Sequence, residues 1–414
     1  MDPAPNPPRP GPLDGVRVLD LTRVLSGPHC TRMLCDLGAE IIKVEPPDGD
    51  MTRFSNPRLN GMAGYFVQQN TGKRNISLDM SKPEALSLLL ELIDRCDVLV
   101  ENFRPGVMDR MGLGWAAVSA RNPRLIYASI SGYGQTGPWV GRRAYAPVVG
   151  AESGWTMAQG DARGGQYAND PHSNADVYTG MECAAGVLAA LYERERTGRG
   201  DRVDVSMAQT MLYVNEHVHD HLWDGPVQPD WIRSFSPGDY PVLAAANGQS
   251  VIISGHPAER GTFDRYIRTI GRPELADDPR FVDVPARLAH LGEIVQVLRD
   301  WAITMSDPEA IEAAFAEHGL ATGALRTVRE ICSTDWAAAR QVVVAVDDRS
   351  QGTIRIPNSP WRFEHTDSGV RGVPRFRGED NRAVLGELLG LDDPALDGLE
   401  AAGVLSSRVP GTAS

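Results

Sequence analysis

Short apolar runs alternate with amphipathic stretches through residues 16–131, and this alternation restricts the chain to few folds. The apolar runs are VRVLDL, EIIKVE, NISLDM, DVLVENF and LIYASIS, and the stretches SGPHCTRMLCDLGA and KPEALSLLLELIDRC have the period of helices. Strands separated by helices form parallel sheets that helices cover on both faces. We therefore expect an α/β fold built around a parallel sheet.

The absence of several known short motifs argues against several kinds of ligand. The first strand-to-helix turn reads LTRVLSGP and lacks the GxGxxG fingerprint of dinucleotide-binding folds, so the sequence does not support NAD binding. No P-loop, GxSxG or kinase signature is present. The stretch HVHDH places His217 and His221 at the i, i+4 spacing of a metal pair, but no cysteine cluster or HExxH accompanies them. We expect no metal site.

The composition limits the partners and the compartment. The 414 residues carry a net charge of −13 and no run of Lys or Arg longer than a pair, which argues against nucleic acid as a partner. No segment reaches the roughly 18 apolar residues that a membrane span needs. Five scattered cysteines in apolar patterns are typical of reduced thiols, so we expect a cytoplasmic protein.

Changes in composition mark the domain boundaries. The opening MDPAPNPPRPGP has six prolines in twelve residues and is expected to be a disordered tail over residues 1–12. After Leu222 the chain becomes rich in Pro, Gly and aromatic residues, as in a linker. A smaller unit of short strands and helices follows, and from Gln341 the chain returns to strands and ends in helices around 381–404.

One carboxylate, Asp176, precedes a helix of small residues in SNADVYTGMECAAGVLAALYERERTG. Asp is a preferred N-cap residue, so capping is one interpretation of Asp176 and a functional role is the other. Gly180 and Gly186 lie inside the helix, where each glycine costs on the order of 1 kcal/mol. We therefore expect a close-fitting neighbour along this helix.

These residues lie in blocks that resemble the family III CoA-transferases. The family contains formyl-CoA:oxalate and carnitine CoA-transferases and α-methylacyl-CoA racemase. The resemblance runs over nearly the whole chain in the blocks PLDGVRVLDLTRVLSGP, GAEIIKVEPPDGD, NTGKRNISLDM, DVLVENFRPGVMDRMGLGW, NPRLIYASISGYGQTGP, ADVYTGMECAAGVLAALYERERTGRG, VDVSM, ADDPRF and EAAGVL.

The resemblance implies an architecture. Members of the family have a large Rossmann-like domain, made from the N-terminal half and the C-terminal segment, and a smaller domain inserted between them. This implies a first part of the large domain at 13–225, a small α+β domain at 226–338 and a completing segment at 339–414. It also implies that two chains interlock as a homodimer.

The resemblance also implies a reaction and its residues. Asp176 matches the catalytic carboxylate, which would move CoA from a donor acyl-CoA to an acceptor carboxylic acid through an aspartyl anhydride and an aspartyl-CoA thioester. CoA is then a co-substrate, and no tightly bound cofactor is expected. The CoA site would be lined by Leu78, Asp79, Met80, Ser81, Asn102, Phe103, Arg110, Arg142 and Arg143.

Departures from the family pattern leave two alternatives open. An α-methylacyl-CoA racemase would pair the aspartate with a histidine in the loop 142–147, where this chain has Tyr145, a poor base at neutral pH. A catalytically silent CoA-binding homologue is suggested by Ala146, where many members carry an acid. The family's glycine-rich lid is absent, and SFSPGDY at 234–240 is the nearest candidate.

Overall fold

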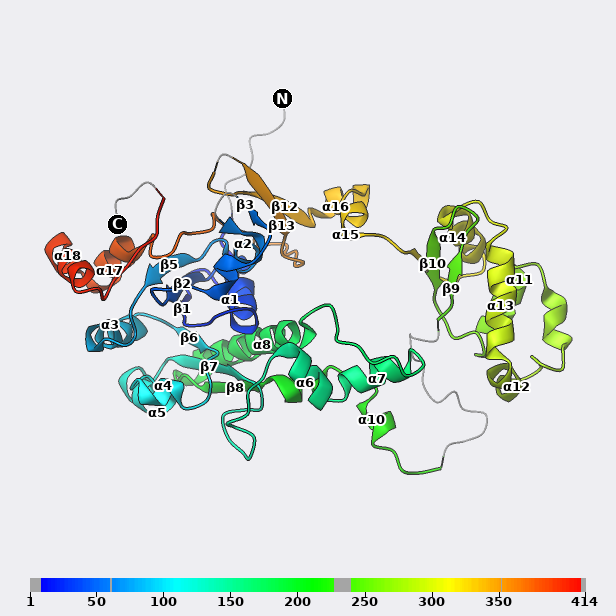
Figure 1. Cartoon of the computed structure of the whole chain (residues 1–414), viewed down its shortest axis with the longest axis horizontal. Coiled ribbons are helices and arrows are strands. Elements are labelled where there is room, and N and C mark those ends of the chain that lie inside the picture. Colours follow the sequence, from blue (N-terminus) through cyan, green and yellow to red (C-terminus); the bar gives the residue numbers. More distant parts are fainter. Residues whose placement is uncertain (1–8, 60–61, 227–239, 351, 411–414) are drawn as a thin grey trace. The chain divides into compact units, whose positions relative to one another are not determined.

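The computed structural model describes residues 9–59, 62–226, 240–350 and 352–410 (Figure 1). The chain divides into two compact units. The large unit combines Met1–Val214 with Trp336–Ser414, and the small unit is Asn215–Asp335. The lid candidate at 234–240 lies almost wholly outside the described residues.

A six-stranded parallel sheet forms the centre of the large unit. The strand order is β5-β2-β1-β6-β7-β8, and each neighbouring pair is parallel. The strands are β1 (Arg17–Asp20), β2 (Glu40–Glu45), β5 (Arg74–Ser77), β6 (Val98–Glu101), β7 (Ile126–Ser131) and β8 (Arg202–Ser206). The α/β fold with a parallel sheet that the alternating pattern predicts is confirmed.

Side chains that alternate along the strands build a hydrophobic core on each face of this sheet. Leu19 and Ile42 point to one core, and Val18 and Ile41 point to the other. The first face is covered by α3 (Pro83–Ile93), α4 (Val107–Arg110), α5 (Trp115–Arg121), α17 (Asn381–Leu389) and α18 (Asp393–Ala401). The second is covered by α1 (Ser26–Asp36), α6 (Ala146–Glu152), α8 (Asn174–Thr197) and α9 (Met207–Tyr213).

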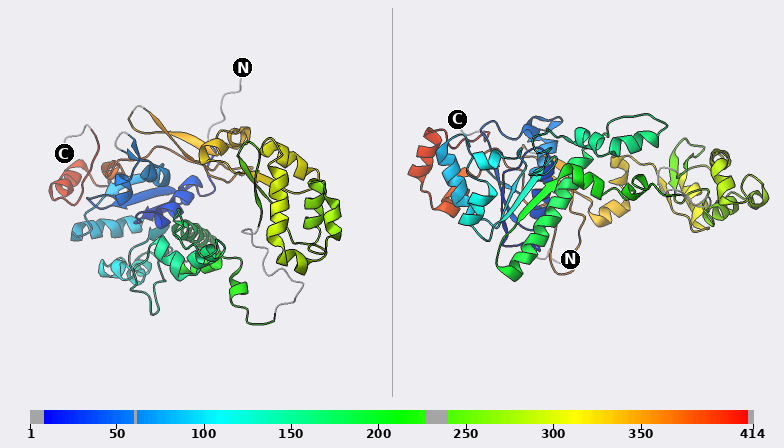
Figure 2. Two further views of the ribbon diagram at one scale, coloured as in Figure 1. Left: turned by 45° about the vertical axis from the view of Figure 1, so that its right-hand side comes forward. Right: turned by 90° about the horizontal axis from the view of Figure 1, so that it is seen from below.

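The C-terminal segment covers the edge of the sheet. The backbone N–H groups of Asn75 and Ser77 on edge strand β5 donate to the side chains of Asp380 and Asn381, both at 2.8 Å. An exposed strand edge would otherwise invite pairing with other chains. Figure 2 shows this C-terminal part, in red, beside the N-terminal strands, in blue.

Smaller elements complete the large unit. A third core joins Met62 and Val67 to Val346 and Ile356, which brings the C-terminal hairpin against α2. These elements are η1 (Met51–Phe54), β3 (Arg58–Leu59), β4 (Met62–Ala63), α2 (Gly64–Asn70), α7 (Trp155–Asp161), α16 (Asp335–Arg340), β12 (Val343–Asp347) and β13 (Thr353–Pro357). No helix in the described ranges is both long and apolar enough to cross a bilayer.

The small unit has an antiparallel sheet in the order β11-β10-β9 and a core of its own around Phe263, Tyr266 and Phe315. Its strands are β9 (Val242–Ala244), β10 (Ser250–Ile253) and β11 (Thr322–Ala324). Its helices are α10 (Val218–His221), α11 (Thr262–Thr269), η3 (Pro273–Asp277), α12 (Val284–Ala289), α13 (Leu291–Ala302), α14 (Pro308–Ala316) and α15 (Val328–Ile331).

Residues 9–12, which the composition places in a disordered tail, contact the folded large unit. The Arg9 backbone N–H donates to Asp367 at 2.8 Å, and the Pro10 carbonyl accepts from the Asp367 N–H at 3.2 Å. Gly11 is buried so closely against Leu37 that a Cβ would lie 2.2 Å from its carbonyl oxygen. These contacts with the folded unit outweigh the proline-rich composition over residues 9–12.

A buried ion network lies beneath the turn that joins β1 to α1. The Asp20 carboxylate accepts hydrogen bonds from Thr22 and Thr31 and pairs with the Lys73 ammonium at 3.1 Å. The Lys43 ammonium pairs with Asp50 at 3.2 Å. Burial alone would raise the pKa of Asp20, but Lys73, Lys43 and the threonine hydrogen bonds outweigh it and hold the pKa at about 2.

The chain has three lysines, and this network uses two of them, Lys43 and Lys73. Lys73→Met would leave the Asp20 carboxylate buried without its ion partner, and we expect the free energy of unfolding of the large unit to fall by about 3–5 kcal/mol. Denaturant unfolding, followed by circular dichroism, measures this loss. Lys82→Met, at the partly exposed third lysine, is the control and should cost less than about 1 kcal/mol. Equal losses in the two variants would contradict the role of the network.

Candidate active site

The turn between β1 and α1 contains a strained residue. Val24 has a φ of 70°, in the left-handed region that β-branched residues avoid. The Val24 N–H donates to the Asp50 carboxylate at 3.2 Å, and the Asn102 side chain bonds the N–H and the carbonyl of Arg23, both at 2.9 Å. Strain of this kind persists where surrounding groups enforce it, often at functional sites. The turn is therefore held in one conformation.

This turn lies where the order of the strands reverses. From β1 the chain adds β2 on one side, and β6 later pairs with β1 on the other. In open α/β sheets, ligands bind beyond the carboxyl ends of the strands at such a point. Asn102 directly follows β6 and donates to the Ser26 hydroxyl at 3.3 Å. The side chain of Asn102 thus joins the two loops that flank the reversal.

Asp176 lies against the same turn. It is half-buried in the first turn of α8, and both the backbone and the side chain of Ser26 form hydrogen bonds with its carboxylate. Burial raises the pKa of Asp176 to about 6, and the Ser26 hydrogen bonds only partly oppose this. The carboxylate is therefore about nine-tenths ionised at pH 7.

The capping interpretation of Asp176 is wrong. The N-cap of α8 is Ser173, three residues earlier, and Asp176 already has a helical position. The helix N-terminus favours the ionised carboxylate, but burial outweighs this effect, so the pKa of Asp176 is raised and not lowered. Asp176 therefore has no capping role that would account for its place in the sequence.

The glycines of α8 allow other segments of the chain to pack closely against this helix. A Cβ on Gly180 would lie 2.6 Å from the Ser26 carbonyl oxygen and 3.2 Å from the His29 Cβ, and a Cβ on Gly186 would lie 2.7 Å from Val203. The close-fitting neighbours are thus helix α1 and strand β8. Gly180 lets the start of α1 approach α8 one turn from Asp176, which brings Ser26 to the carboxylate.

The predicted CoA residues that follow β5 lie at the same carboxyl edge of the sheet. Leu78 is buried, and its N–H donates to the Glu45 carbonyl at 2.9 Å. The Asp79 carboxylate accepts hydrogen bonds from the backbone and hydroxyl of Ser81. Met80 packs on the core under α3. The four residues form a tight turn, and Leu78 has a core position rather than a free surface.

The predicted residues after β6 and β7 differ in their freedom to bind a ligand. Phe103 packs on the core, and Arg110 is exposed at the end of α4. Arg142 pairs with Glu152 at 2.5 Å and stacks on Trp139 with the guanidinium carbon 4.4 Å from the ring centroid, while Arg143 is exposed. Arg110 and Arg143 are free to meet an anion, whereas Arg142 is already engaged.

Ser26 and Tyr65 also interact with Asp176, and no motif in the sequence indicates either residue. Burial, together with the charges of Asp176 and Asp50, raises the pKa of Tyr65 to about 12, so its hydroxyl keeps its proton at neutral pH. These residues come from α1 and α2, and no spacing in the sequence connects them with α8.

Two histidines of the HVHDH stretch, where we expect no metal site, contact a neighbouring acid. His217 caps the four-residue helix α10 and bonds Asp220 at 2.9 Å, and His219 also meets Asp220, at 3.0 Å. The His217 and His219 rings stack with an interplanar angle of 26°. The described part of the chain has no group of three or more His, Cys, Asp or Glu side chains placed to hold a metal ion.

Relatives of known sequence share almost the full length of the chain. The chain is 35% identical to formyl-CoA:oxalate CoA-transferase of Streptomyces coelicolor, over 95% of this chain and 99% of the relative. It is 36% identical to acetyl-CoA:oxalate CoA-transferase of Acetobacter aceti, over 86% and 90%. It is 31% identical to the beta subunit of succinyl-CoA–L-malate CoA-transferase of Chloroflexus aurantiacus, over 95% and 98%.

Solved structures and the family model agree with these relatives. An aspartate-to-alanine mutant of Rv3272 from Mycobacterium tuberculosis has a TM-score of 0.78 and 31% identity, covering 90% of this chain and 98% of that one. A CAIB/BAIF family protein from Brucella suis has a TM-score of 0.78 and 30% identity, covering 92% and 100%. The model of CoA-transferase family III matches residues 13–381, and the chain belongs to this family.

Proposed function

We propose that this family III CoA-transferase moves CoA from a donor acyl-CoA to an acceptor carboxylic acid, with Asp176 as the nucleophile. The observation that carries the proposal is the half-buried Asp176 carboxylate, bonded by Ser26 at the reversal of strand order. No cation in the described residues is among the groups that act on its pKa, so its charge is not neutralised by an ion pair. A carboxylate with a pKa near 6 is ionised at neutral pH and a better nucleophile than one with a lower pKa.

The first two steps load the enzyme. The Asp176 carboxylate attacks the thioester carbonyl of the donor, the C–S bond breaks, and CoA thiolate leaves an acyl-aspartyl anhydride. The thiolate then attacks the aspartyl carbonyl, the donor acid leaves as a carboxylate, and an aspartyl-CoA thioester remains. The N–H and hydroxyl of Ser26 already bond the carboxylate, so they are placed to stabilise the oxyanion that forms on the aspartyl carbonyl.

The last two steps reverse this chemistry with the acceptor. The acceptor carboxylate attacks the aspartyl-CoA thioester and releases CoA thiolate, which leaves an anhydride between the acceptor and Asp176. The thiolate attacks the acceptor carbonyl, so the new acyl-CoA leaves and the Asp176 carboxylate is restored. CoA acts as a co-substrate, no metal takes part, and no tightly bound cofactor is consumed.

The geometry favours transfer over racemisation. Tyr145, in the loop where a racemase histidine is expected, is 66% exposed and is the N-cap residue of α6. His29 lies against α8, but the charged groups that act on its ring are Arg32 and Lys73, and burial lowers its pKa. An acid–base pair across a substrate α-carbon would need a histidine coupled to Asp176.

Asp176→Asn should abolish transfer. The amide keeps the size of the side chain but cannot form an anhydride, so we expect the rate of transfer to fall by about 10⁴-fold or more. Hydroxylamine added during turnover should trap a hydroxamate on Asp176 of the parent, and intact-mass analysis followed by peptide mapping detects it.

Asp161→Asn is the matched control for this variant. Asp161 is an exposed acid of α7, and its amide can still accept the Tyr167 hydroxyl, which lies at 3.0 Å from the carboxylate. The control should keep full activity and form the adduct. Transfer that survives in Asp176→Asn, with no adduct in the parent, would rule out the covalent route.

The pH dependence should report the raised pKa of Asp176. Because the nucleophile must be ionised, kcat/KM should rise through a pKa of about 6. The rate at pH 5 should be about tenfold below that at pH 7. A profile that is flat from pH 5 to 7.5 would show that ionisation of Asp176 does not limit the reaction.

The same pKa shift predicts how stability depends on pH. The folded-state pKa of about 6 lies above the unfolded value, so burial of the ionised carboxylate destabilises the fold above pH 6 and not below about pH 4. Asp176→Asn should therefore unfold at a higher temperature than the parent at pH 8, with a gain of about 1–2 kcal/mol after screening by solvent is allowed for. The difference should vanish near pH 4, which scanning calorimetry can follow.

We also propose that the chain forms a homodimer. Large apolar side chains on one face of α8 are exposed, at 45% for Met181, 36% for Leu188 and 70% for Tyr192. Their spacings of seven and four residues place them in one stripe along the helix. An apolar stripe left open on a structural helix favours a closed two-fold assembly with a second copy.

Light scattering at micromolar concentration should give about 90 kDa, twice the chain mass of 44.9 kDa. Tyr192→Glu would place a charge in the stripe, and we expect it to shift the protein toward the monomer. Leu222→Glu, a change at an exposed apolar residue outside the stripe, is the control. A parent that remains monomeric at these concentrations would remove the dimer.

A further inference from the structure

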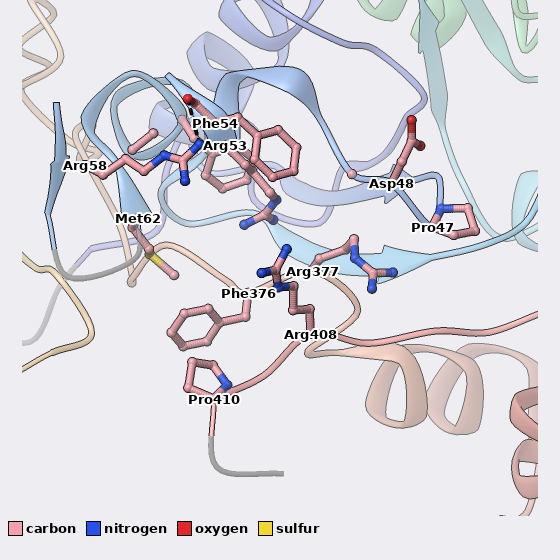
Figure 3. Close-up of a pocket in the computed structure, with 13 residues that line it drawn as sticks. Pro47, Asp48, Arg53, Phe54, Arg58, Met62, Phe376, Arg377, Arg408 and Pro410 are labelled. Carbon is pink, nitrogen blue, oxygen red and sulfur yellow. Dashed lines mark hydrogen bonds between the residues drawn. The ribbon is translucent and has the colours of Figure 1, made fainter. Parts of the chain in front are cut away.

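A pocket of about 350 Å³ opens in the large unit beyond the carboxyl ends of β2 and β5 (Figure 3). Three segments line it: the loop after β2, the region from η1 to α2, and the C-terminal segment. Four of its lining side chains are arginines, namely Arg53, Arg58, Arg377 and Arg408, and one is an acid, Asp48. None of them belongs to the predicted CoA site.

Arg53 is neutralised within the protein. Its guanidinium bonds both oxygens of the Glu45 carboxylate at 2.7 Å and stacks on the Phe66 ring, 3.6 Å from the centroid. The Arg53–Glu45 ion pair therefore forms a neutral part of the pocket lining. The positive charge of the pocket comes from the other three arginines.

The other three arginines have no ion pair with a carboxylate in the described residues. Arg58 donates to the Phe54 carbonyl at 2.8 Å, and Arg377 donates to the hydroxyls of Ser77 and Ser406 at 2.7 and 2.5 Å. The Arg408 backbone N–H donates to the Arg377 carbonyl at 2.9 Å, which fixes Arg408 beside Arg377. Figure 3 shows the guanidinium groups of Arg377 and Arg408 near each other in the pocket.

The arginines of the pocket repel one another, and this repulsion disfavours the charged form of Arg377. Burial, together with repulsion from Arg53 and Arg408, lowers the pKa of Arg377, although Glu45 and Asp48 partly oppose this. A ligand with two negative charges would remove the repulsion, and guanidinium groups match the geometry of phosphate oxygens. Phe54 and Phe376, also in the lining, offer flat apolar faces next to the charges.

We propose that Arg58, Arg377 and Arg408 form a binding site for a phosphate monoester. This inference rests on the proposed function for its favoured source, the 3′-phosphate of CoA. Arg377, in the pocket lining, donates to Ser77, the last residue of β5, which directly precedes the predicted CoA residue Leu78. A free phosphorylated ligand would offer the same group, so the test separates the two sources.

The test measures binding, which needs no catalysis, by titration calorimetry of the full chain with CoA, 3′-dephospho-CoA, 3′,5′-ADP and inorganic phosphate. The variant is Arg58→Gln with Arg408→Gln, and Arg377 is left intact because it bonds two serines. We expect the Kd for 3′,5′-ADP to rise by about 10- to 100-fold in the double variant. Arg95→Gln, an exposed arginine at the amino edge of β6, should leave it unchanged.

The ligands identify the source. If the variant weakens CoA but changes dephospho-CoA by less than about threefold, the 3′-phosphate of CoA occupies the pocket. If it weakens 3′,5′-ADP or inorganic phosphate while CoA is unchanged, the pocket serves a separate phosphorylated ligand. If no ligand binds the variant more weakly than the parent, the proposal is overturned. Because binding is measured without turnover, failure of the Asp176 mechanism would not be mistaken for failure of this site.

Discussion

The buried ion network under the β1–α1 turn is the interaction on which the candidate active site depends. Lys43 donates to the Thr22 carbonyl at 2.8 Å and pairs with Asp50, whose carboxylate in turn holds the strained Val24 N–H. A buried charge is tolerated only when its partners are complete, so each member of this network fixes the next. The buried network therefore fixes the position of the turn that directly precedes Ser26.

The close packing of α1 against α8 brings Ser26 to Asp176, while the ion network holds the turn before Ser26. Gly180 removes the side chain that would block α1, and Ser26 at the start of α1 then reaches the Asp176 carboxylate. The same close packing shields Asp176 from water and raises its pKa. The raised pKa of Asp176 and the position of its carboxylate thus have one structural cause, which is the tight contact between α1 and α8.

Much of this fold, but less of the site, is predictable from the sequence. The alternation of strands and helices predicts the parallel sheet because the two periods differ clearly, and the glycines of α8 predict a close neighbour but not its identity. The capping interpretation of Asp176 fails because a helix can start at any of several adjacent polar residues, and here Ser173 takes that place. Tyr65 and the arginine pocket give no local signal, because their partners lie in distant segments that only the folded sheet brings together.

The C-terminal segment connects the stability of the sheet with ligand binding. Asp380 and Asn381 accept hydrogen bonds from the N–H groups at the edge of β5. The same C-terminal segment supplies Arg377, just before them, and Arg408, after α18. These hydrogen bonds hold the C-terminal segment against β5. Arg377 and Arg408 therefore cannot move away from the pocket unless the segment also leaves the edge of the sheet. A phosphate bound there would in turn hold the segment on β5. Ligand binding and closure of the sheet edge therefore favour the same arrangement of the chain, which gives a physical reason for a large unit built from both ends of the sequence.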